Sequence, residues 1–162
     1  MNKSLAVILL IGISFIAMRT APAANLQSEP VIFSNDSMRW TDCPTMPAGC
    51  KMVILYGDTK KTEEFAVRFK YPAKYRIGPH THASDEHVTV ISGGPFHLVV
   101  GDKFDDGAPS GKTLHVGDLA VVPAGTQHFA WMENETVLQV NGIGPFKRDF
   151  IDPANKSSGV PN

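Results

Sequence analysis

Short strand-like runs separated by turn-forming residues recur through most of this 162-residue chain. The run 64–71 is the clearest, because apolar side chains alternate there with Ala66, Arg68 and Lys70, as on a strand with one buried face. We expect further strands at 51–56, 86–91, 96–100, 113–116, 119–122, 127–132 and 136–141, with a final edge strand at 146–150. The chain contains 14 Gly and 12 Pro, which fall mostly between these runs. The pattern predicts an all-β sandwich or barrel in a single domain.

Composition and charge exclude several classes of protein. The chain is 43% hydrophobic and 19% charged, which is typical of a globular protein. Its formal net charge is −1, so it lacks the basic excess expected of a nucleic-acid binder. No long run of like charge is present, and we therefore expect neither an acidic tail nor a polybasic membrane patch.

The first residues resemble an export signal. Lys3 precedes an uncharged apolar run of roughly 15 residues, shorter than the roughly 20 that span a membrane. Ala21 and Ala23 then fit the small-x-small rule for cleavage. We expect a signal peptide at 1–23, an N-terminal arm at 24–50, a barrel at 51–152 and a flexible tail at 153–162. The mature protein would be secreted, with no membrane association after cleavage.

Export decides how the two cysteines are interpreted. Cys43 and Cys50 enclose a loop with two prolines and one glycine, which brings the chain back on itself. A disulfide is the expected state in an oxidising compartment, and so short a loop gives at most about 2–3 kcal/mol. The spacing is not that of a redox-active pair or of a zinc site.

Four residues form a candidate metal-ligand set. His80 and His82 are two positions apart, so on a strand both side chains point to the same face. Glu86 follows at the same parity, and His128 comes directly after a turn at the start of a later strand. Each of these signals alone is weak, because exposed strand histidines and solvated carboxylates are common. Together, imidazoles and one carboxylate are donors that suit a divalent transition metal.

Two spaced motifs in the chain resemble those of the cupin superfamily. The first is usually written G-x5-H-x-H-x3–4-E-x6-G and the second G-x5-P-x-G-x2-H-x3-N. The matching residues are His80, His82, Glu86 and Gly93 in the first motif, and Gly117, Pro123, Gly125 and His128 in the second. Two positions depart from the pattern: Lys74 stands at the opening glycine, although Gly78 is nearby, and Met132 stands at the closing asparagine. Neither position is a metal ligand in the family.

The resemblance implies a double-stranded β-helix, the cupin or jelly-roll barrel, with a metal inside one end. By the family pattern, His80, His82, Glu86 and His128 would ligate one divalent ion. The donor types select Fe, Mn, Ni or Zn without choosing among them. Four ligands on an octahedral ion leave two positions open for substrate or O₂. Glu86 is also the candidate catalytic base.

Other polar residues leave alternatives open. His87 should point away from the other ligands, but a bulge would turn it inward and give a site of four histidines. His97 and His115 are expected to face solvent. Gln139 and Asn141 share a face of a late strand and are weak candidates for binding substrate oxygen, if that face is interior.

The resemblance suggests a function only in outline, because the cupin fold hosts many chemistries. The principal hypothesis is a periplasmic, metal-dependent dioxygenase acting on a small oxygenated molecule, similar to short bacterial cupins. The alternative is a non-catalytic binding or sensing module, whose metal is structural or helps capture a carboxylate or sugar acid. A germin-like extracellular protein is a weaker third hypothesis. Cupins are commonly dimers, and a homodimer is expected here because the strand containing Phe129 and Trp131 is apolar on both faces. The alternative is that a loop or the N-terminal arm at 31–40 covers the outer face.

Overall fold

The computed structural model of the protein describes residues 29–107 and 111–152. The expected signal peptide at 1–23 and tail at 153–162 lie outside this range, so their assignments stay predictions. The described residues from Phe33 onward belong to one compact unit, and residues 29–32, which have no regular secondary structure, belong to another. The elements are η1 (Asn35–Ser37), β1 (Thr41–Asp42), β2 (Lys51–Tyr56), β3 (Glu64–Tyr71), β4 (Arg76–Thr81), β5 (Glu86–Ser92), β6 (Phe96–Val100), β7 (Lys112–Leu114), β8 (Leu119–Val122), β9 (His128–Met132), β10 (Thr136–Ile143) and β11 (Asp149–Phe150).

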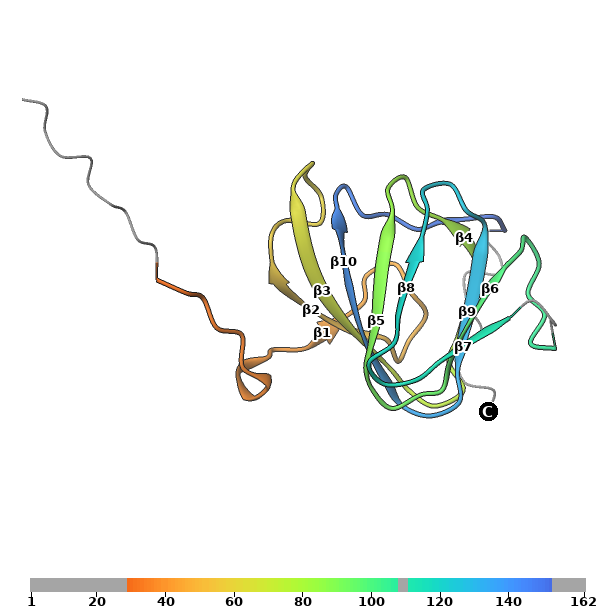
Figure 1. The fold of residues 1–162 in the computed structure, drawn as a ribbon, viewed down its shortest axis with the longest axis horizontal. Helices are drawn as coiled ribbons and strands as arrows, with labels where there is room; N and C mark the ends of the chain where they lie inside the picture. Colours follow the sequence, from red (N-terminus) through yellow and green to blue (C-terminus); the bar gives the residue numbers. More distant parts are fainter. Residues whose placement is uncertain (1–28, 108–110, 153–162) are drawn as a thin grey trace, which may run out of the picture. The chain divides into compact units, whose positions relative to one another are not determined.

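The strands form two antiparallel sheets that face one another (Figure 1). The six-stranded sheet has the order β1-β2-β3-β10-β5-β8, and the five-stranded sheet has the order β11-β4-β9-β6-β7. Alternating residues of both sheets point into the core between them, among them Phe65, Val67, Val88, Val90, Ala130, Met132, Leu138 and Val140. The predicted all-β barrel class is confirmed.

Most predicted strands agree with the structure within two residues. The expected bounds of β2, β3, β6 and β8 are those observed. The strand β11 is an edge strand as expected, but it begins at Asp149 and is shorter than the predicted 146–150. The predicted strand at 113–116 is β7, which ends at Leu114. Two strands were missed: β1, which extends the six-stranded sheet into the N-terminal arm, and β4.

A bulge in β4 explains why this strand was missed. Ile77 pairs with Ala130 and His80 pairs with His128, so β4 contains one residue more than β9 over the same stretch. The extra length falls at Gly78 and Pro79, which in the sequence resemble a turn. The bulge lets Ile77 and His80 both be buried despite their odd spacing.

The outer face of β9 is covered from within the chain. Phe129 is buried, and its ring lies 5.0 Å from that of Phe104, in the loop after β6. The guanidinium of Arg76 lies 5.1 Å from the centroid of the Phe104 ring. The apolar outer face of β9, which suggested a dimer, is therefore accounted for without a second copy. The homodimer stays a prediction with no support from this feature.

The N-terminal arm is fastened to the barrel near its disulfide. Cys43 and Cys50 are joined, and the N–H of Cys43 donates to the carbonyl oxygen of Cys50 at 3.1 Å. The hydroxyl of Tyr75 donates to the carbonyl oxygen of Pro47 at 2.9 Å, which ties this loop to the core. Within the described ranges, no helix has the length and apolar character needed to cross a membrane.

Candidate metal centre

Three buried histidines meet between the sheets. His80 is on β4, His82 lies just beyond the end of β4, and His128 is the first residue of β9. One ring nitrogen of each lies within 4.8 Å of the others. The pairing of β4 with β9 explains part of this arrangement, because His80 and His128 are direct partners across the two strands.

Backbone hydrogen bonds tie the turn before His128 to the segment after His82. The N–H of Gly125 donates to the carbonyl oxygen of His82 at 2.9 Å. The N–H of Ala124 donates to Asp85 Oδ1 at 2.8 Å. Gly125 has φ of +75°, a conformation that side chains other than glycine adopt at a cost. The two motifs found in the sequence are thus held together through their turns.

The same hydrogen bond orients each histidine ring. Nδ1 lies 2.8 Å from the Gly78 carbonyl oxygen in His80, 2.9 Å from that of Lys147 in His82, and 2.9 Å from that of Thr126 in His128. A carbonyl oxygen only accepts, so Nδ1 carries the hydrogen, and in a neutral ring Nε2 is left with its lone pair. Such backbone contacts are typical of metal-binding histidines.

Glu86 adds a carboxylate to the cluster. Its Oε2 lies 3.6 Å from His82 Nε2 and 3.5 Å from His128 Nε2. Strand β5 pairs with β8 in regular register from Glu86 onward, so His87 points the other way and is exposed. No bulge turns His87 inward, and the structure brings Glu86 to the histidines instead.

The environment sets the charges of the cluster. Burial, followed by the neighbouring His128 and Arg148, holds the pKa of His80 well below its usual value. Burial also lowers the pKa of His82. Burial by itself raises the pKa of Glu86, but the contact with His128 and the charges of His82 and Arg148 outweigh it and bring this pKa to about 2. The cluster therefore offers imidazole nitrogens and a charged carboxylate near neutral pH.

The donor set fits a divalent transition metal. His82 Nε2 is buried and has no hydrogen-bond partner among the described residues, a state that costs free energy unless another group binds it. Nitrogen and carboxylate donors of this kind suit Fe, Mn, Ni and Zn. A metal ion binds such donors in their deprotonated forms, so a divalent ion would displace any proton held between them.

A small cavity lies beside the cluster and is lined by His80, Glu86 and His128. Two further residues line this cavity, and the sequence did not indicate either of them. They are Tyr71 on β3 and Arg148, which lies between β10 and β11; Arg148 Nη2 donates to the Tyr71 hydroxyl at 3.3 Å. The cavity measures about 20 Å³, enough for about one water molecule. Burial raises the pKa of Tyr71 to about 12, so its hydroxyl stays protonated. The sequence does not single out Arg148, because Lys147 and Asp149 are also charged residues between Phe146 and Phe150.

The weak substrate candidates lie elsewhere. On β10, Leu138 and Val140 point into the core, so Gln139 and Asn141 lie on the opposite face. Gln139 Oε1 accepts from Arg68 Nε at 3.0 Å, and its Nε2 donates to Asn141 Oδ1 at 3.2 Å. The structure does not bring either residue to the histidine cluster.

The remaining histidines behave differently from one another. His115 is exposed, as expected. His97 was also expected to face solvent, but only 16% of its side chain is exposed, because its ring stacks on Trp131 at 4.6 Å between centroids. Its Nδ1 lies 3.1 Å from Thr113 Oγ1 and its Nε2 lies 2.8 Å from Glu133 Oε1, so both ring nitrogens have a hydrogen-bond partner.

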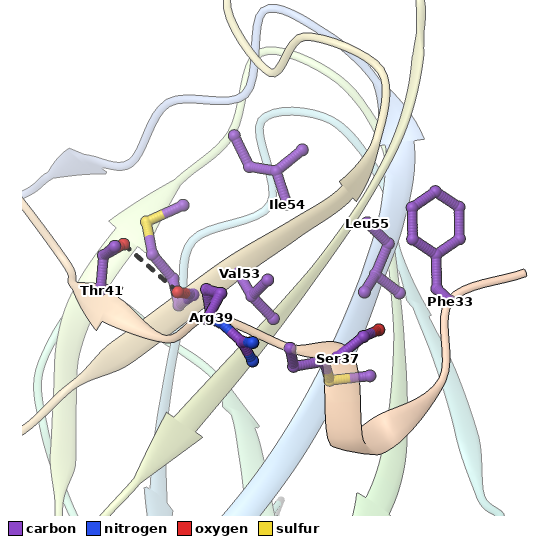
Figure 2. A pocket seen from close by; sticks show the side chains of 9 residues that line it. Phe33, Ser37, Arg39, Thr41, Val53, Ile54 and Leu55 are labelled. Carbon is purple, nitrogen blue, oxygen red and sulfur yellow. Dashed lines mark hydrogen bonds between the residues drawn. The ribbon is translucent and has the colours of Figure 1, made fainter.

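A larger pocket lies between β2 and the segment 33–41. Figure 2 shows Arg39 among the mainly apolar side chains that line it. Its volume is about 400 Å³, and its lining residues are Phe33, Ser37, Met38, Arg39, Thr41, Met52, Val53, Ile54 and Leu55. None of these is a histidine, cysteine or carboxylate, so this pocket lacks the donors of the histidine cluster.

Comparison with solved structures identifies the architecture. The structure is similar to an RmlC-like cupin from Shewanella frigidimarina, with a TM-score of 0.55 and 23% identity over 72% of this chain and 91% of that one. It is also similar to a double-stranded β-helix protein from Klebsiella pneumoniae, with a TM-score of 0.52 and 20% identity over 74% of this chain and 97% of that one. The protein has the cupin fold. KdgF from Halomonas is a further neighbour, with a TM-score of 0.53 and 22% identity over 70% of this chain and 94% of that one. No protein-family model and no curated protein matches the sequence.

The two positions that depart from the cupin motifs differ in their local environments. Lys74, at the opening glycine position, has φ of +62°, the left-handed conformation that glycine favours. Met132, at the closing asparagine position, is fully buried in the core. Lys74 thus adopts this conformation at the cost of some strain, and Met132 adds apolar packing.

Proposed function

We propose that this protein is a secreted or periplasmic, metal-dependent cupin enzyme of the dioxygenase type that acts on a small oxygenated organic molecule. One observation carries the proposal: three buried histidines have Nδ1 fixed by backbone carbonyls and a second ring nitrogen turned toward a common point beside Glu86. His82 Nε2 is buried and has no hydrogen-bond partner among the described residues, and such an atom has a physical reason to be there if it binds an ion.

His80, His82, Glu86 and His128 would hold the ion. When bound, such an ion supplies Lewis-acid positions at which a substrate oxygen and O₂ can lie side by side. The backbone carbonyls of Gly78, Lys147 and Thr126 orient the rings, and the apolar core around the site excludes bulk water. The protein's part is therefore to fix the donors and keep the site dry.

Glu86 is better placed as a ligand than as a base. An efficient general base has a pKa near the working pH. The pKa of Glu86 is about 2, so the carboxylate is charged but accepts a proton weakly. Its proximity to both His82 and His128 also favours a shared role with them.

A binding or sensing module is the second candidate function. It is favoured by the small size of the cavity beside the donors, about 20 Å³, which is far below the 300–1,000 Å³ of ordinary ligand pockets. In this case the ion would be structural or would hold a very small ligand.

Elemental analysis of the protein isolated from its own compartment tests the proposal. We expect one equivalent of metal per chain, and iron would support oxygenase chemistry. Zinc, or no metal, would favour the binding module. The same preparation tests export, because N-terminal sequencing should begin at Ala24; an intact N-terminus on protein from the cytoplasm would contradict it.

A further inference from the structure

Arg148, a half-buried residue beside the metal-ligand cluster, has an unused donor. Arg148 Nε is buried and has no hydrogen-bond partner among the described residues. Its Nη2 donates to Tyr71, and both side chains line the cavity that His80, Glu86 and His128 also line. A buried N–H of a charged group without an acceptor is costly, so the position calls for an explanation.

The segment that contains Arg148 is fixed against the cluster. Figure 1 shows this connection, in blue after β10, crossing from one sheet to the other toward β4. The carbonyl oxygen of Lys147 accepts from His82, and the Phe146 ring stacks on the His82 ring with centroids 4.7 Å apart. The guanidinium of Arg148 lies 4.7 Å from the Phe69 ring centroid and 5.3 Å from that of Phe146. Arg148 is therefore held in place by packing against these two rings and by its hydrogen bond to Tyr71.

The charges around the cavity do not balance once an ion is bound. Glu86 contributes one negative charge and Arg148 one positive charge, so these two cancel. A divalent ion would then leave two uncompensated positive charges in a buried site, which is unfavourable without an anion. Arg148 adds a planar donor suited to a carboxylate.

We propose that the site binds a small carboxylate, which contacts the ion at one end and Arg148 with Tyr71 at the other. This inference rests on the metal site of the proposed function and names the ligand class for it. The Tyr71 hydroxyl accepts from Arg148, so its own hydrogen is free to be donated to a ligand oxygen. The cavity of about 20 Å³, enough for about one water molecule, limits the ligand, or the part of it that enters, to little more than the carboxylate group itself.

Formate and formamide test the inference, because they have the same number of heavy atoms and differ in charge. The cobalt-loaded protein is titrated with each, and binding is followed by the cobalt absorption spectrum. We expect formate to bind the wild-type protein and Arg148→Gln to weaken formate about 10- to 100-fold, as for the loss of a charged hydrogen bond, with formamide little changed. Arg148→Lys should retain part of the affinity. The control is Arg76→Gln, since Arg76 pairs with Asp106 at the surface.

The outcomes separate the two proposals. If the wild-type protein does not bind cobalt stoichiometrically, the metal site itself is wrong. If it binds cobalt but formate leaves the spectrum unchanged, the carboxylate assignment is wrong while the metal site stands. The assignment is also overturned if Arg148→Gln binds cobalt and formate as tightly as the wild type. Should Arg148→Gln not fold, Arg148→Lys and Tyr71→Phe take its place, and unchanged formate binding in both has the same meaning.

Discussion

Histidines on the two faces of the five-stranded sheet are partnered in different ways. On the outer face, His97 Nδ1 contacts Thr113 Oγ1 at 3.1 Å, Nε2 contacts Glu133 Oε1 at 2.8 Å, and the ring stacks on Trp131. On the inner side, His82 satisfies Nδ1 with a backbone carbonyl and leaves Nε2 buried without a hydrogen-bond partner. Partial burial therefore does not by itself make a histidine a candidate ligand.

The difference lies in which hydrogen-bonding capacity is left over. His97 uses both ring nitrogens within the chain and has no lone pair to offer. The rings of the cluster are fixed through one nitrogen and converge through the other. Strand alternation supplies both environments from one strand, because on β9 His128 and Ala130 point inward while Phe129 packs under the Phe104 loop.

The largest expected effect is on the inner side. His80→Ala combined with His82→Ala removes two of the three nitrogen donors, so we expect stoichiometric binding of a divalent metal to be lost. The loss should exceed the roughly 10- to 100-fold that outer-shell changes cost. Metal analysis after dialysis measures the bound metal, and far-UV circular dichroism measures the fold. The β spectrum should be unchanged. One equivalent of metal in the double variant would refute the assignment.

The inner cluster could be predicted from the sequence because its geometry depends on short spacings. His80 and His82 are two apart, Glu86 keeps their parity, and the turn before His128 contains Pro123 and Gly125. Parity and turn chemistry are local rules, and they need no knowledge of which strands pair. The strand bounds of β3 and β8 were predictable for the same reason. The place of His128 beside His80 does depend on the pairing of β4 with β9, and only the resemblance to the cupin motifs indicated it.

What was missed depends on contacts between distant segments. Arg148 lies outside regular structure, and its role follows only from the crossing of its segment to His82 and Tyr71. Gln139 could not be placed, because the apolar Val137 shares its face and blurs the alternation on β10. His97 was expected at the surface because Trp131 and Glu133 belong to another strand and the turn after it.

A second test separates Glu86 from its neighbour. Glu86→Gln keeps the side chain's shape and removes a negative charge beside the ion, so metal affinity should fall by about 10- to 100-fold, the scale of a lost charged interaction. His87→Gln is the matched control, because His87 is exposed on the other face of β5. It should leave metal affinity unchanged and shift the free energy of unfolding by no more than about 0.5 kcal/mol. The reverse result would assign His87 to a site of four histidines and free Glu86 to act as a base.

The smallest expected effect belongs to the outer face. His97→Gln removes the stacking on Trp131 and alters the contact with Glu133, so the free energy of unfolding should fall by about 1 kcal/mol. The electrostatic part of this change in free energy is small, because 46% of the Glu133 side chain is exposed and water screens its contact with His97. A double-mutant cycle of His97→Gln with Glu133→Gln, measured by urea unfolding, should give a coupling of about 0.2–1 kcal/mol. Metal content should stay at the wild-type level in all three variants. Loss of metal in His97→Gln would show that the two faces of the sheet are coupled. A histidine whose two ring nitrogens both have hydrogen-bond partners would then still affect metal binding on the opposite face.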